Sequence, residues 1–257
     1  MHITSIIAVI IDSRNKESID NANSKLFKLF FITGIITCFV DFLTTEILTL
    51  FVPLLLILAI RKHEEREDTL KNTFKFVIKS CILWLIGYAG MWLAKWAIAS
   101  LVLNINVLDY VKDNAMKRIN GLQGLSNYEE LYKHVIEKNI DTIPLIHIIN
   151  IKVYKWEIKL ALATVAVLLL VFIDWKNLKK KKYSLVMLFI GIMPYLRYLI
   201  LANHSYRHAM FTYRDQIITI MAILFILLDC FNYNLIFKKV SITKPLKFGT
   251  KTKESKD

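Results

Sequence analysis

The residues best suited to chemistry lie in one tract, from Asn203 to Asp215, between two long apolar segments. Arginine presents a planar fork to phosphate, histidine can share a proton with it, and tyrosine can stack or donate a hydrogen bond. We therefore expect this tract to recognise an anion such as the phosphate of a membrane lipid. Its candidate binding residues are Asn203, His204, His208, Tyr213 and Arg214.

Two other readings of the tract stay open. The His, Tyr and Arg side chains could form an interfacial belt that anchors the flanking helices at headgroup level. His204 and His208 are four residues apart and would share one face of a helix, but the only obvious acidic third ligand nearby is Asp215, and no HExxH motif is present. We predict no metal site.

Three further charged residues interrupt apolar segments and are expected near the same membrane face. Lys95 lies between two tryptophans, Arg197 leads into the tract, and Glu46 follows Asp41 in a polar break. An ionised side chain within a span costs roughly 2.5 to 3.5 kcal/mol on insertion scales. We therefore expect Lys95 and Arg197 to pair with Asp41 or Glu46, or those carboxylates to act in catalysis.

The elements that must position these residues are membrane helices. The chain has 257 residues, a 55% hydrophobic composition and only seven glycines and four prolines, which predicts an all-α, polytopic membrane protein forming one domain over residues 1–257. A span needs about 20 apolar residues. The expected spans, about six, are 26–41, 46–60, 79–103, 156–174, 184–202 and 216–237. The pair within 26–60 could instead form a re-entrant hairpin, and residues 1–11 an interfacial segment or part of a further span.

Basic residues set the expected orientation. Residues 61–79 carry six Lys and Arg, residues 175–183 carry five, and the tail 238–257 carries seven lysines. With six spans these segments share one side, which the positive-inside rule places in the cytoplasm together with both termini. The same rule accounts for the formal charge of +13, so we expect no nucleic-acid partner.

The segment 104–155 is then extracytoplasmic. Its patches 107–119 and 128–140 have apolar residues three and four apart, which predicts small amphipathic helices on the outer membrane face. Walker A, Rossmann and GxSxG motifs are absent from the sequence, so we expect neither nucleotide hydrolysis nor a cofactor.

Several stretches together resemble a known kind of membrane protein. They are Asp41–Leu54, Gly87–Trp96, Pro194–Tyr198, Asn203–Ser205 and Phe211–Arg214. They look like the C-terminal part of uncharacterised multi-spanning envelope proteins of Gram-positive bacteria, which are similar in topology to polyprenyl-phosphate-dependent glycosyltransferases of the GT-C type. The resemblance implies a sugar transferred from a lipid phosphate carrier at the outer face, with Asp41 as the candidate base and Lys95, Arg197, His204 and His208 as phosphate contacts. Those enzymes usually have more spans and a large outer domain.

Three functions are therefore weighed. The first is a protein of the bacterial cell membrane that handles a lipid-linked phosphate or sugar donor, with membrane lipid or a polyprenyl-phosphate-linked substrate as its partner. The second is the six-span membrane subunit of an exporter, and the third is a non-catalytic immunity or assembly protein. A transporter would place polar residues along a path near the bilayer midplane, whereas here most of them gather at one face, which favours the first function.

Overall fold

The computed structural model is all-helical and describes residues 2–15, 18–40, 44–66, 68–120, 127–142 and 182–230. No β-strand occurs within these ranges, in agreement with the predicted fold class. The helices, in chain order, are α1 (His2–Arg14), α2 (Ile19–Val40), α3 (Leu48–His63), α4 (Leu70–Leu103), α5 (Val107–Asn120), α6 (Tyr128–Asp141), α9 (Lys182–Ile200), α10 (Ala202–Arg207), α11 (Ala209–Thr212), the 3-10 turn η2 (Tyr213–Asp215) and α12 (Gln216–Cys230).

Four stretches of helix are long and apolar enough to cross a membrane. They are Ile19–Val40, Leu70–Leu103, Tyr183–Ile200 and Ala209–Leu228. They overlap the predicted spans 26–41, 79–103, 184–202 and 216–237. The predicted span 156–174 lies outside the described residues, so a total of six spans stays a prediction.

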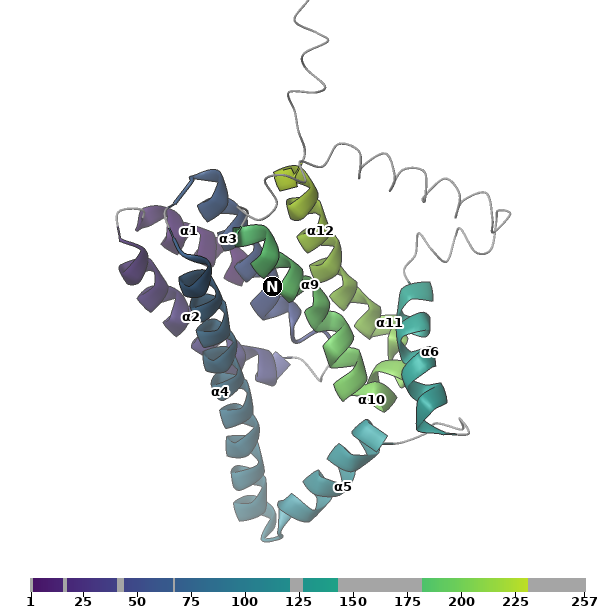
Figure 1. Ribbon diagram of the computed structural model, residues 1–257. Helices are drawn as coiled ribbons and strands as arrows, with labels where there is room; N and C mark the ends of the chain where they lie inside the picture. The colour runs from purple at the N-terminus through teal and green to yellow at the C-terminus, as the bar shows by residue number, and fades with distance from the viewer. Residues whose placement is uncertain are drawn as a thin grey trace, which may run out of the picture.

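The long helices α2 and α4 run parallel and form one side of the bundle (Figure 1). They cross where Gly34 faces the backbone of Trp84 and Gly87 faces the backbone of Phe31. A Cβ atom on either glycine would lie 2.1 or 2.2 Å from a carbonyl oxygen of the other helix. The close crossing therefore depends on both glycines, as in small-residue contacts between membrane helices.

Helix α3 is the interior element of the bundle. Its 16 residues span about 24 Å, less than the roughly 30 Å of a hydrocarbon core. Ten of the 16 are buried, because α1, α2, α9 and α12 all pack against it. The predicted span 46–60 thus corresponds to a short, enclosed helix that is apolar on nearly every side.

Helix α1 packs along α2 and α3, and whether residues 1–11 are interfacial or part of a further span stays a prediction. Its last turn contacts Arg61 through Asp12, and Thr4 lies near Val40 and Thr44 at the opposite end of the bundle. In this arrangement the start of α1 and the segment 61–79 lie at opposite ends. The cytoplasmic placement of both termini and of the segment 61–79 stays a prediction.

Helices α9 and α12 form the other side of the bundle as an antiparallel pair (Figure 1). At their crossing, the hydroxyl of Thr219 donates a hydrogen bond of 2.8 Å to the carbonyl oxygen of Gly191. A Cβ on Gly191 would come within 3.0 Å of the Cβ of Ala222. The pair brings the last turn of α9 beside the turn that precedes α12.

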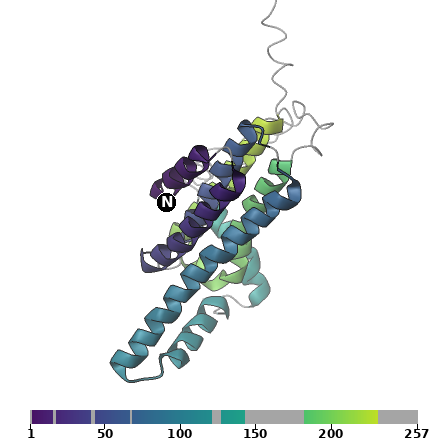
Figure 2. The same cartoon turned by 90° about the vertical axis from the view of Figure 1, so that its left-hand side faces the viewer.

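Helices α5 and α6 match the two amphipathic patches predicted at 107–119 and 128–140. Helix α5 turns back from the far end of α4 after Asn104, whose φ is 53° (Figure 2). Helix α6 buries Leu131 and Val135 against Tyr198 and Ala202 of α9 and α10.

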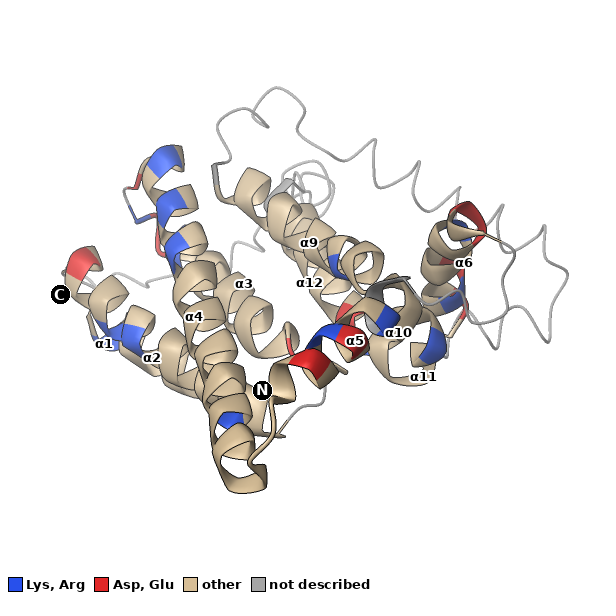
Figure 3. Cartoon of the chain, turned by 90° about the horizontal axis from the view of Figure 1, so that it is seen from below, with Lys and Arg blue, Asp and Glu red and all other residues tan. Residues whose placement is uncertain are grey.

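Seen from below, most of the length of the bundle helices is free of charge, while Lys and Arg mark the first turns of α4 (Figure 3).

Candidate functional site at the Glu46 end of the bundle

A buried ion cluster centred on Arg197 holds this end of the bundle together. The guanidinium Nε and Nη2 donate to the two carboxylate oxygens of Glu46, at 2.7 and 3.1 Å. Nε also lies 3.3 Å from Oδ2 of Asp215, and Nη1 lies 3.4 Å from the hydroxyl of Ser205. The side chains of Arg197 and Glu46 are 6% exposed and that of Asp215 is fully buried. The predicted pairing of Arg197 with an acidic residue at 41–46 is confirmed for Glu46.

Each member of the cluster comes from the end of a helix. Arg197 lies in the last turn of α9, Glu46 in the turn that leads into α3, and Asp215 in η2 just before α12. Because α3, α9 and α12 pack against one another, their ends converge. The guanidinium of Arg197 thus joins the ends of three helices through two carboxylates, and its predicted contact with phosphate stays a prediction.

The tract 203–215 is broken into short elements and does not form one continuous helix. The rings of His204 and His208 lie with centroids 4.6 Å apart. The amide of Asn203 donates to the backbone carbonyl of Lys117 in α5. Among the residues that the structure describes, no group of three or more His, Cys, Asp or Glu could hold a metal ion.

A hydrogen-bonded network ties the tract to α6. The hydroxyl of Thr212 donates to Oδ1 of Asn139 at 2.6 Å, and Nδ2 of Asn139 donates to the carbonyl of Ser205 at 3.2 Å. The hydroxyl of Tyr198 donates to the carbonyl of Thr212 at 2.8 Å. Asn139 is fully buried, so this network fixes the amphipathic helix onto the bundle.

Among the described residues, Lys95 contacts the last turn of α2. Its Nζ donates to the carbonyl oxygen of Cys38 at 2.7 Å and lies over the rings of Phe39 and Trp92. Cys38 is in the last turn of α2, where carbonyl groups lack helical partners and attract a cation. Within the described residues, Lys95 and Arg197 have separate partners, and neither lines one of the three main pockets. Asp41, the predicted catalytic base, lies outside the described residues.

A pocket of about 640 Å³ opens next to this cluster, between α1, α2, the turn 44–47 and the start of α12. Its polar lining is formed by six threonines and one arginine, which are Thr4, Thr33, Thr37, Thr44, Thr45, Thr49 and Arg214. Aliphatic side chains of Ile36, Val40, Leu48 and Ile217 complete it. The guanidinium of Arg214 is exposed and rests 5.8 Å from the ring centroid of Phe211. Hydroxyl groups and a guanidinium together are donors suited to an oxyanion.

Part of the pocket wall is held rigidly. The hydroxyls of Thr37 and Thr49 lie 2.9 Å apart, and Trp84 donates to Thr49 at 3.2 Å. Of the predicted binding residues, only Arg214 lines this pocket, whereas Tyr213 is half-buried beside it in the chain. Sequence reasoning missed the threonines. Their signal is the four-residue spacing of Thr33 and Thr37, which places both hydroxyls on one face of an apolar helix.

A second buried ion cluster lies at the other end of the bundle. Nη2 of Arg61 donates to Oδ1 of Asp12 at 2.6 Å and to Oδ1 of Asn23 at 2.8 Å. Nη1 of Arg66 lies 3.2 Å from Oδ2 of Asp12, and its Nη2 lies 2.6 Å from Glu64. Arg61 and Arg66, predicted only as orientation signals, therefore also join α1 to α3.

Fold and composition together define the class: an all-α protein whose described part contains four helices able to cross a membrane. Comparison with protein-family models, with curated proteins and with solved structures gave no match. The resemblance to envelope proteins of Gram-positive bacteria therefore stays a prediction.

Proposed function

We propose that this chain is a polytopic membrane protein that binds the phosphate-bearing head of a lipid in the threonine-lined pocket. The proposal rests on the lining of this pocket. Six threonines, Arg214 and several aliphatic residues surround a volume of about 640 Å³. A phosphate would accept hydrogen bonds from the guanidinium of Arg214 and from pocket hydroxyls such as that of Thr33. The hydroxyls of Thr37 and Thr49 already donate to the carbonyl oxygens of Thr33 and Glu46. The first units of an apolar tail would lie against Ile36, Val40 and Ile217.

The predicted orientation would make this an extracytoplasmic site. If the basic segment 61–79 faces the cytoplasm, the pocket, at the opposite end of α2 and α3, faces outward. A polyprenyl phosphate, as implied by the resemblance to glycosyltransferases, has the required combination of one phosphate and a long apolar chain. The proposed role is binding of such a carrier, and transfer of a sugar, with Asp41 as base, is the further step that the resemblance implies.

The test compares a polyprenyl monophosphate with the uncharged polyprenol of equal length, using native mass spectrometry of the protein released from nanodiscs. The intact protein should retain the phosphate form preferentially. Arg214→Gln should reduce that preference by about tenfold, the loss expected for a hydrogen bond between charged groups. Arg207→Gln is the matched control, because Arg207 is exposed in the same tract but does not line the pocket.

Equal retention of polyprenol and its phosphate by the unmodified protein would refute the proposal. So would an Arg214→Gln variant that keeps the full preference for phosphate. Thr33→Val removes one pocket hydroxyl at nearly constant shape, and we expect a smaller loss of the same kind from it.

A further inference from the structure

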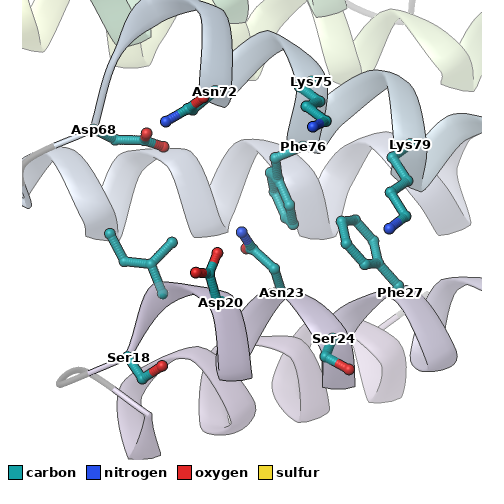
Figure 4. A pocket seen from close by; sticks show the side chains of 11 residues that line it. Ser18, Asp20, Asn23, Ser24, Phe27, Asp68, Asn72, Lys75, Phe76 and Lys79 are labelled. Atoms are coloured by element: carbon teal, nitrogen blue, oxygen red, sulfur yellow. The ribbon is translucent and has the colours of Figure 1, made fainter.

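A second polar pocket lies at the opposite end of the bundle, between the first turns of α2 and α4 (Figure 4). It has a volume of about 710 Å³, within the roughly 300–1,000 Å³ of small-molecule sites. The charged side chains that line it are Asp20, Asp68, Lys75 and Lys79. Two carboxylates and two ammonium groups give the pocket no net charge but both signs.

The two signs are separated along the pocket. Figure 4 shows Asp20 and Asp68 toward one end and Lys75 and Lys79 toward the other. The acids stand at the beginning of the parallel helices α2 and α4, and the lysines lie one to three turns further along α4. A ligand that bridges both ends therefore needs an anion on one side and a cation on the other.

The floor of the pocket is aromatic and firmly held. The rings of Phe27 and Phe76 lie 5.7 Å apart between centroids. Nζ of Lys79 lies 4.5 Å above the ring of Phe27. The guanidinium of Arg61, which belongs to the buried ion cluster with Asp12, lies 4.5 Å from the ring of Phe76. The aromatic pair thus connects the pocket to the buried ion cluster of Arg61 and Asp12.

The pocket lies at the height where both helices change from polar to apolar. Beyond the lysines, the lining faces continue at helical spacing through Phe31, Ile82 and Ile86, which are 38%, 51% and 53% exposed. An acyl chain of a lipid can pack against these exposed side chains. The order from the aqueous end is therefore carboxylates, lysines and then exposed apolar residues.

We propose that this pocket binds a phospholipid whose headgroup is phosphoethanolamine. In such a lipid the phosphate lies nearer the hydrocarbon than the ammonium group does, which matches lysines placed deeper than aspartates. The ammonium group donates hydrogen bonds to Asp20 and Asp68, and the phosphate accepts from Lys75 and Lys79. A trimethylated choline has no N–H to donate, so the pocket distinguishes the two headgroups. This site is separate from the threonine-lined pocket and holds independently of it.

The experiment measures lipid retention by native mass spectrometry after reconstitution in nanodiscs of equal parts phosphoethanolamine, phosphocholine and phosphoglycerol lipids. The intact protein should retain the phosphoethanolamine lipid about tenfold over the phosphocholine lipid. Asp20→Asn combined with Asp68→Asn should abolish that discrimination. Lys75→Gln combined with Lys79→Gln should weaken retention of both lipids to a similar degree.

The matched control is Lys28→Gln combined with Lys71→Gln, because these exposed lysines lie on the same two helices outside the pocket; it should leave retention unchanged. Asp68 accepts a hydrogen bond from the backbone of Thr69 before α4, so Asp20→Asn alone serves if the double variant does not fold. Equal retention of the two zwitterionic lipids, a preference for phosphoglycerol, or displacement by soluble glycerophosphoethanolamine as effective as by the lipid would overturn the proposal.

Discussion

The crossing of α2 and α4 at two glycines allows a sharp test of the fold. Gly87→Ala would place a Cβ 2.2 Å from the carbonyl oxygen of Phe31, and Gly34→Ala would place one 2.1 Å from that of Trp84. Carbon and oxygen in weak contact stay about 3.3 Å apart or more, so the helices must separate by roughly 1 Å. The obstructing atoms are backbone, which a rotamer change cannot relieve. We expect a loss of about 1–3 kcal/mol, the usual cost of overpacking.

Gly90→Ala is the control, because a Cβ at Gly90 meets nothing within 4 Å. Gly87 and Gly90 are in the same helix, three residues apart, so alanine raises helix propensity by a similar amount at each, up to about 1 kcal/mol. The difference between the two variants therefore isolates the packing cost. With about 2–4 °C per kcal/mol for a chain of this size, Gly87→Ala should melt roughly 2–12 °C below Gly90→Ala.

The assay is the decay of the monodisperse size-exclusion peak after heating in detergent. The combined variant Gly34→Ala and Gly87→Ala should lose less than the sum of the two single losses, since the separation forced by one alanine admits the other. If Gly87→Ala and Gly90→Ala melt at the same temperature, the helices do not cross at these glycines and the reasoning is wrong.

Three other predictions concern buried polar groups. Each is measured in detergent, as a melting temperature or as protection of backbone amides from hydrogen exchange. Arg197→Met should destabilise the protein by about 3–5 kcal/mol, because Glu46 would stay buried without its cation; a melting temperature within 2–4 °C of the unmodified protein, roughly a change of 1 kcal/mol, would contradict this. Asp12→Ala should cost a similar amount by stranding Arg61, and its melting temperature is compared with that of the unmodified protein. Asn139→Ala should cost about 1–3 kcal/mol and raise hydrogen exchange in α6 more than in α3, whereas uniform exchange would show that the network does not fix α6.

Local sequence patterns predicted most of the secondary structure. Long apolar runs predicted α2, α4, α9 and α12, and three- and four-residue spacing predicted α5 and α6. The ends were less accurate, since α4 begins at Leu70, where the Thr69 side chain accepts from the Asn72 backbone, and the prediction began at 79. The predicted span left out the first turns of α4, because their lysines lower the hydropathy of this segment without disfavouring a helix.

The site was predicted in part. A charge within an apolar segment needs a partner, so the sequence predicted Asp41 or Glu46 as the partner of Arg197, and the structure shows the pair with Glu46. Asp215 was considered only as a metal ligand, and Asp12 was not considered, because nothing local distinguishes a buried carboxylate from an exposed one. Lys95 was expected to pair with Asp41 or Glu46. It bonds to the carbonyl of Cys38, since the end of a helix supplies negative charge without an acidic residue, while its pairing with Asp41 lies outside the described residues.

The sequence by itself determined that this chain is helical, apolar and charged at the ends of its helices, because hydropathy and periodicity depend on neighbouring residues. Only the tertiary structure decided which charges meet: Glu46 and Arg197 are 151 residues apart and Asp12 and Arg61 are 49 apart. It also decided that threonines from several elements form one pocket with Arg214. Such groupings depend on how closely and in which rotation helices pack, and at α2 and α4 that is fixed by two glycines whose role appears only when their backbones touch.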